Sequence, residues 1–122
     1  MKTRPYRVLS IRQPWATLII EGIKPVENRT WRVDYRGPIL IQASLHRDAE
    51  LIAQHGLKAS ELEYGAVIGR VDLIDITEDH PSPYYVPGNF AWVFANPRRI
   101  EPIPMRGQLR MFTAHLPLKL RS

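Results

Sequence analysis

Residues 65–77 restrict the possible folds of this chain most strongly, because they form its longest strand pattern and are apolar on both faces. Successive side chains of a strand point to opposite sides of a sheet. One predicted face carries Val67, Val71 and Leu73, and the other carries Ile68, Asp72, Ile74 and Ile76. A strand with apolar residues on both sides needs cover on both sides, so this segment is predicted to be part of a barrel wall with another element packed outside it.

Shorter strand and helix patterns surround this segment. The remaining predicted strands are residues 6–11, 26–33, 39–43, 90–94 and 108–112, with an extended, proline-spaced segment at 100–104. Two helices are predicted, from Pro14 to Gly22 and from Arg47 to His55. Because strands and helices do not alternate regularly, we predict a small α+β domain whose mixed or antiparallel sheet curls into a barrel.

The composition supports one domain and excludes several chemistries. A chain of 122 residues can bury about two thirds of its unfolded surface in a single core. It contains no cysteine, which excludes disulfides, thiolate metal sites and cysteine nucleophiles. Its four histidines lack ligand spacing and it has no glycine-rich phosphate loop, so neither a metal nor another cofactor is expected.

The charge balance favours a nucleic-acid or phosphorylated partner. Arginine supplies 13 of the 17 basic residues, against 12 acidic residues, and the net charge is +5. The guanidinium group binds phosphate at two points and stacks on bases. Ordinary solubility is the alternative explanation for a basic surface.

No targeting or membrane segment is expected. The first seven residues carry three basic side chains and lead into polar Arg12 and Gln13 rather than into an apolar run. No apolar stretch approaches membrane-spanning length. Together with the lack of cysteine, this predicts a soluble cytoplasmic protein without a membrane partner.

The ten residues 22–31 place a lysine, a carboxylate, an arginine and an indole close together. In the second predicted strand, the two-residue period puts Glu27, Arg29 and Trp31 on one face. Lys24 lies just before this strand, and its side chain is long enough to reach the same surface. This density predicts a binding site. The alternative is a solvated ion pair between Glu27 and Arg29.

Four other polar or aromatic residues are candidates for the same site. Ser10 and Gln13 either hydrogen-bond a ligand or cap the first helix. Ser44, at the end of a strand, has the same two interpretations. Trp15, like Trp31, either stacks on a nucleobase or packs in the core.

The segment 77–89 is predicted to be a long loop, because it contains three prolines and a glycine. Its Tyr84 and Tyr85 either close over a ligand as a lid or belong to a mobile segment. Trp92 follows the loop within an apolar strand and is assigned to the core.

Residues 9–16 and 22–29 resemble the ASCH domain family. The family pattern G-x-K-x-x-E-x-R is met by Gly22, Lys24, Glu27 and Arg29, and it follows a helix as in the family. Further agreement comes from residues 35–38, 43–44, 69–75, 96–97 and 104–107. The similarity covers nearly the whole chain, so residues 1–122 are identified as a single ASCH domain.

The resemblance implies a PUA-like barrel with two or three helices flanking a cleft. The cleft would be lined by Lys24, Glu27 and Arg29 and would bind RNA more readily than DNA. A protein partner in RNA-associated machinery is a further implication. The sequence does not specify the RNA or the oligomeric state.

Some members of the wider family resemble hydrolases that act on RNA or on modified nucleosides, and fold is shared more widely than function. In the amidohydrolase branch, a threonine three residues after the motif lysine is the implied nucleophile, but this chain has Glu27 there. The alternative function is therefore a metal-independent hydrolase in which Glu27 activates water. Lys24 would then act as a base or as a fixed cation.

Overall fold

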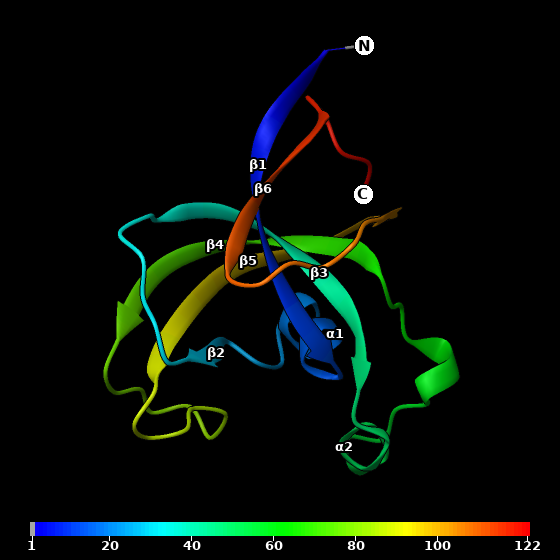
Figure 1. The fold of residues 1–122 in the computed structure, drawn as a ribbon. Coiled ribbons are helices and arrows are strands. Elements are labelled where there is room, and N and C mark those ends of the chain that lie inside the picture. Colours follow the sequence, from blue (N-terminus) through cyan, green and yellow to red (C-terminus); the bar gives the residue numbers. More distant parts are fainter. Residues whose placement is uncertain (1) are drawn as a thin grey trace.

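The computed structural model describes residues 2–122 and has an α+β fold built on one sheet (Figure 1). The elements are β1 (Thr3–Gln13), α1 (Trp15–Ile20), β2 (Val26–Arg29), β3 (Gly37–Arg47), α2 (Ala49–Gln54), the 3-10 helix η1 (Ala59–Glu61), β4 (Ala66–Thr77), β5 (Phe90–Pro104) and β6 (Met111–Pro117).

The six strands are ordered β2-β5-β4-β3-β1-β6. The β1–β3 pair is parallel and the other four pairs are antiparallel. The predicted mixed sheet is therefore confirmed. A closed barrel is not confirmed, because among residues 2–122 the ladder ends at β2 on one side and at β6 on the other.

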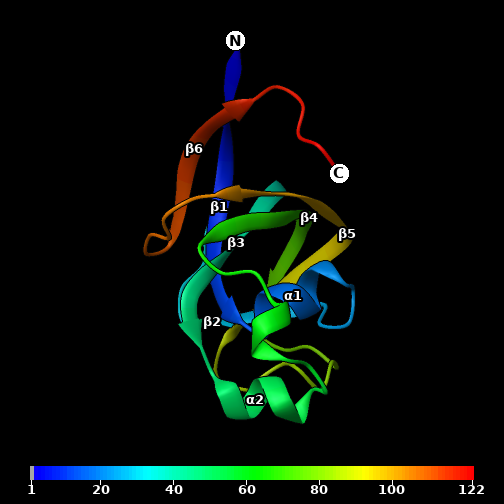
Figure 2. The same cartoon turned by 90° about the vertical axis from the view of Figure 1, so that its right-hand side faces the viewer.

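Helix α1 packs against β1, β3, β4 and β5, in the hollow of the curved sheet (Figure 2). Its five buried residues make it part of the main core. Pro14 precedes its first residue, and Gly22, with φ +78°, lets the chain leave the helix in a left-handed conformation. This turn directs the chain into the short strand β2.

Two apolar clusters explain why the sheet is apolar on both sides. The first surrounds α1 and includes Leu9, Ile11 and the fully buried Trp92, as predicted for Trp92. The second lies on the other side of β1 and includes Tyr6 and Val8. Odd and even positions of β1 thus serve different cores, as the strand period requires.

The predicted faces of β4 are wrong in detail. Val67 belongs to the second cluster, whereas Ile68, Val71 and Leu73 all belong to the first. Pairing with β5 shifts register at three places between Val67 and Asp75. Each such bulge changes which side the following residues face, so simple alternation fails along this strand.

Other boundaries also differ from the sequence prediction. β1 and β3 are longer than the predicted strands 6–11 and 39–43, and Arg47 ends β3, where it pairs with Gln13 of β1, instead of starting the second helix. β2 ends at Arg29 instead of continuing to residue 33, and β6 covers 111–117 instead of 108–112. The segments 90–94 and 100–104 belong to one strand, β5, which continues through the left-handed Asn96 (φ 51°). η1 is a short helix without a predicted counterpart.

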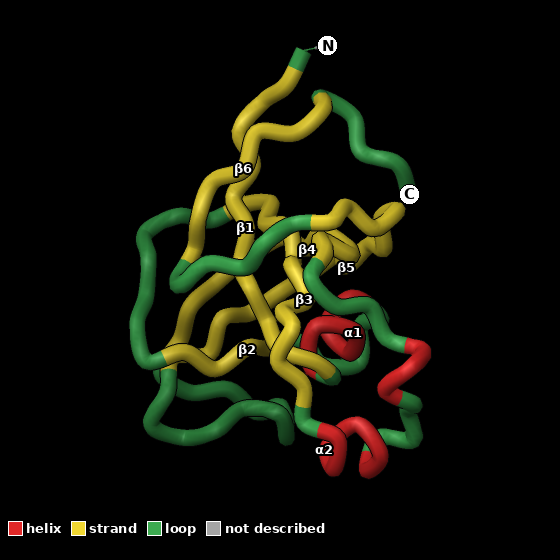
Figure 3. The backbone as a smooth tube through the Cα atoms, turned by 45° about the vertical axis from the view of Figure 1, so that its right-hand side comes forward, coloured by secondary structure: helices red, strands yellow, loops and turns green. Residues whose placement is uncertain are grey.

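The chain ends and the helix α2 lie at opposite ends of the fold. The start of β1, the end of β6 and the C-terminus lie toward one end, while α2 and the loop 78–89 lie at the far end (Figure 3). Neither α-helix in the described part of the chain has the length and hydropathy that a membrane span requires.

Candidate functional site

A cavity of about 810 Å³ lies at the α2 end of the fold. Its walls come from the end of β1, the start of α1, β2, the end of β3, α2 and two loops, at residues 83–86 and 108–110. We call it the main cavity. Its size is within the range typical of small-ligand sites.

Glu27 lies between two cations on the wall of the main cavity. Lys24 Nζ donates to its Oε1 at 2.8 Å, and an Arg29 terminal nitrogen donates to its Oε2 at 3.0 Å. The side chains of Lys24, Glu27 and Arg29 are 3%, 11% and 24% exposed. The cluster is therefore largely removed from solvent, unlike the solvated surface pair considered from the sequence.

Further contacts hold both cations in place. Lys24 Nζ also donates to the Val26 carbonyl at 2.7 Å and lies 5.3 Å from the centre of the Trp15 ring. Arg29 donates to the Ser10 carbonyl at 2.9 Å, which ties β2 to β1. Arg29 Nε is buried and has no hydrogen-bond partner within residues 2–122. A buried donor without a partner carries a desolvation cost.

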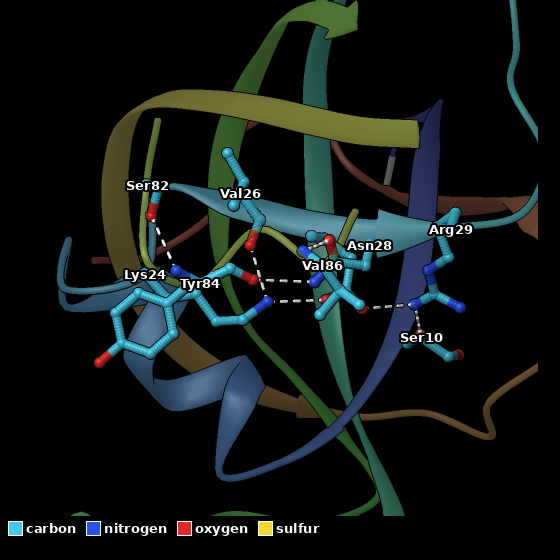
Figure 4. Close-up of polar contacts among 9 residues, drawn as sticks. Ser10, Lys24, Val26, Asn28, Arg29, Ser82, Tyr84 and Val86 are labelled. Carbon is cyan, nitrogen blue, oxygen red and sulfur yellow. Dashed lines mark hydrogen bonds and ion pairs between the residues drawn. The ribbon is translucent and has the colours of Figure 1, made fainter. Parts of the chain in front are cut away.

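The loop 78–89 is fastened to β2 by Asn28. The Asn28 amide donates to the Tyr84 carbonyl at 2.9 Å, and its oxygen accepts from the Val86 backbone N–H at 2.8 Å (Figure 4). Tyr85 is buried, and its hydroxyl donates to two carbonyls of the same loop. Tyr84, in contrast, lines the main cavity.

An aromatic wall stands beside the charged cluster. Trp15 meets His55 edge to face at 5.3 Å and Tyr84 at 6.2 Å between ring centres. Tyr84 and His55 lie nearly parallel at 6.3 Å. This wall joins α1, the end of α2 and the loop 78–89.

The main cavity is cationic. Four basic side chains, Arg12, Lys24, Arg29 and Arg110, line it together with one carboxylate, Glu27. Arg110 has a left-handed backbone (φ 59°), and its guanidinium lies 5.0 Å from the Trp31 ring centre. Non-glycine residues in this conformation are uncommon and often occur at functional sites. The excess of cations favours an anionic ligand.

The structure brings six of the eight predicted site residues to the main cavity: Ser10, Trp15, Lys24, Glu27, Arg29 and Ser44. Gln13 and Trp31 lie outside its lining. Gln13 accepts from the Thr17 backbone N–H at 3.0 Å and donates to the Glu63 carbonyl at 2.9 Å, so it stabilises the start of α1.

Trp31 does not share the face of Glu27 and Arg29, because β2 ends before it. Its ring packs edge to face on Trp92 at 4.8 Å, and its carbonyl accepts from the Trp92 indole N–H at 3.1 Å. Both contacts are with the core, so the structure assigns Trp31 the packing role that the sequence had left open.

Sequence reasoning missed Arg12, Asn28, His46, Gln108 and Arg110 as lining residues. The two-residue period of a strand could have identified two of them. Arg12 and His46 each lie two positions after a predicted site residue, Ser10 and Ser44, on the same strand face. Gln108 and Arg110 come from a distant loop, which no local pattern links to β2.

The chain is similar to known proteins over most of its length. The ASCH domain family matches residues 9–104. Activating signal cointegrator 1 of Homo sapiens is 29% identical over 130 aligned residues, which cover 85% of this chain and 21% of the human protein. Activating signal cointegrator 1 of Mus musculus is 30% identical over 124 residues, with the same coverage. The chain thus spans about a fifth of the length of these curated relatives.

Proposed function

Because the chain belongs to the ASCH domain family, we propose that it binds RNA and that the main cavity holds a nucleotide or a short single-stranded segment. The observation that carries this proposal is the contact between a fixed cationic cluster and an aromatic wall in one cavity. A nucleotide combines an anionic phosphate with a flat heterocycle, and it matches both features.

Each part of the cavity has a role in this proposal. Glu27 fixes the two cations, and the Arg29 guanidinium, whose side chain is 24% exposed, donates to a ligand oxygen. Arg12, which is exposed and has no ion pair recorded within residues 2–122, neutralises a phosphate. Trp15 and Tyr84 stack on a base. Single-stranded RNA is favoured because its unstacked bases can enter such a cavity.

The hydrolase alternative would require Lys24 or Glu27 to act as a free base. Two of the three N–H groups of Lys24 are already donated to Val26 and Glu27, and each Glu27 oxygen accepts from a cation. These contacts support binding rather than turnover. A protein partner, suggested by the name cointegrator of the curated relatives, remains a prediction.

Titration of fluorescent single-stranded RNA, followed by anisotropy, tests the proposal. Arg12→Ala is the main variant because its side chain is exposed and its loss leaves the core intact. Lys58→Ala, a loss of the same charge outside the main cavity, is the control. We expect several-fold weaker binding for Arg12→Ala and little change for Lys58→Ala. Equal losses would indicate only general electrostatic attraction, and unchanged binding by both would contradict the proposal.

A further inference from the structure

A second basic groove, of about 420 Å³, lies beside the start of β1 and the segment after β6. Five cationic side chains line this terminal groove: Arg4, Arg70, Arg98, Arg99 and Lys119. They come from β1, β4, β5 and the segment after β6. The described lining contains no Asp or Glu side chain.

The sheet register places two of these arginines directly opposite each other. Arg70 of β4 pairs with Arg98 of β5 in the antiparallel ladder. Like charges at directly opposed positions destabilise a sheet. Neither guanidinium has a hydrogen bond or ion pair recorded within residues 2–122. The fold therefore retains an unfavourable pair that a bound anion would neutralise.

Arg99, in the same groove, differs from Arg70 and Arg98 because its guanidinium is paired with a carboxylate. Its two terminal nitrogens donate to the Glu63 carboxylate at 2.6 and 3.2 Å. These hydrogen bonds raise the pKa of Arg99 above its ordinary value. Arg70 and Arg98 lack such a carboxylate in the described part of the chain, which leaves their guanidinium groups available to a ligand.

The terminal groove is suited to phosphates rather than to bases. Its aromatic residue, Tyr6, is buried, with its hydroxyl donated to the carbonyls of Pro117 and Leu118. The Arg4 guanidinium lies over the Tyr6 ring, 4.4 Å from its centre. The groove therefore offers guanidinium groups but no exposed ring for stacking. Such contacts position a nucleic acid without reading its sequence.

We propose that the terminal groove binds phosphates of the same RNA strand whose base or nucleotide occupies the main cavity. This inference rests on the proposed function of the main cavity. Arg4 in the groove and Ser10 in the cavity are six residues apart on β1, which corresponds to about 20 Å. A stacked strand with a rise of about 3.4 Å per nucleotide needs about six nucleotides to connect them, and an unstacked strand needs fewer.

This geometry makes the effect of the groove depend on RNA length. A dinucleotide reaches one site only, whereas an oligonucleotide of about sixteen residues reaches both. The test compares the wild-type chain with Arg70→Ala/Arg98→Ala by anisotropy for both lengths. Salt is varied between about 50 and 200 mM, because released counterions report the number of phosphate contacts.

A matched control is Arg32→Ala/Lys58→Ala, which removes the same charge from exposed positions outside both sites. For Arg70→Ala/Arg98→Ala we expect roughly tenfold weaker binding of the long RNA and unchanged binding of the short one. The salt slope for the long RNA should fall by about 1.4, at about 0.7 per lost single-strand phosphate contact. Arg70→Lys/Arg98→Lys should recover most of the affinity.

Three outcomes would overturn the inference. They are wild-type affinity and salt slope for the long RNA in Arg70→Ala/Arg98→Ala, an equal loss for both RNA lengths, or an equal loss in the control variant. Failure of the main-cavity proposal has a different signature. In that case Arg12→Ala binds the short RNA as well as the wild-type chain does, whatever the groove variants do.

Discussion

Lys24 and Glu27 form a buried ion pair, with Nζ 2.8 Å from Oε1, that joins the turn after α1 to β2. Glu27 also accepts from Arg29, so one carboxylate stabilises two cations in the wall of the main cavity. Burial of charges is costly, and the gain from pairing often only offsets this cost. The cluster is thus better suited to fixing cations for a ligand than to stabilising the fold.

Replacement of Glu27 by Gln is expected to destabilise the chain by about 3 kcal/mol, because it leaves two shielded cations without their anion. Chemical denaturation measures this loss. The control is Glu61→Gln, which breaks a 3.8 Å pair with Lys58 whose side chains are 78% and 68% exposed. Its cost should be below about 0.5 kcal/mol. Similar values for the two variants would show that the Lys24–Glu27–Arg29 cluster behaves as a surface pair.

Local patterns in the sequence were sufficient for much of the fold and for the centre of the candidate site. Glu27 and Arg29 share a face because β2, although short, pairs with β5 without a register shift. Lys24 is close in sequence, so its side chain reaches the same carboxylate. Trp92, within an apolar strand, was assigned to the core from its neighbours alone.

The remaining features depend on contacts between distant segments. The bulges of β4 arise from its pairing with β5, and neither sequence by itself indicates the register shifts. Gln13 accepts from the Thr17 backbone N–H at the start of α1, and the other end of its amide donates to the Glu63 carbonyl, 50 positions later. Arg110 reaches the main cavity through a loop about 80 residues from the motif, and it stays in place through contacts such as that with Trp31.

Asn28→Ala is expected to release the loop 78–89, because both groups of the Asn28 amide hold that loop. Two hydrogen bonds at about 1 kcal/mol each correspond to roughly tenfold or more in the local opening equilibrium. Amide hydrogen exchange at Tyr84 and Val86 measures the opening. Asn28→Asp keeps the acceptor for Val86 and should show a smaller effect. Unchanged exchange in Asn28→Ala would mean that the loop is held by its internal contacts.

The purified chain is expected to bind RNA without cleaving it, since Lys24 and Glu27 are mutually engaged. Incubation with end-labelled RNA and with an acylated cytidine, without added metal, should give no product above a protein-free control. Reproducible turnover that disappears in Lys24→Ala would instead support the hydrolase alternative. Thermal unfolding of Lys24→Ala must be measured in parallel, because this variant also leaves Glu27 with one cation fewer.

Tyr84→Ala is expected to weaken binding of single-stranded RNA by about 1–3 kcal/mol, the usual contribution of one base–aromatic stack. The ring of Tyr84 lines the main cavity, whereas the loop is anchored through the Tyr84 main-chain carbonyl, which the substitution preserves. Loss of affinity without faster loop exchange would therefore report on the ring itself. Tyr84→Phe should bind almost as well as the wild-type chain, because it retains the ring.

The control for Tyr84→Ala is Tyr64→Ala, which removes a ring that lies outside the main cavity and whose hydroxyl donates to the Ala59 carbonyl. It tests whether loss of any half-buried tyrosine reduces binding through general destabilisation. Equal affinities of Tyr84→Ala and the wild-type chain would contradict stacking on the aromatic wall. The cationic cluster would then bind a phosphate without help from the Tyr84 ring. Trp15, in contact with Lys24 and His55, would be the remaining ring near the bound strand.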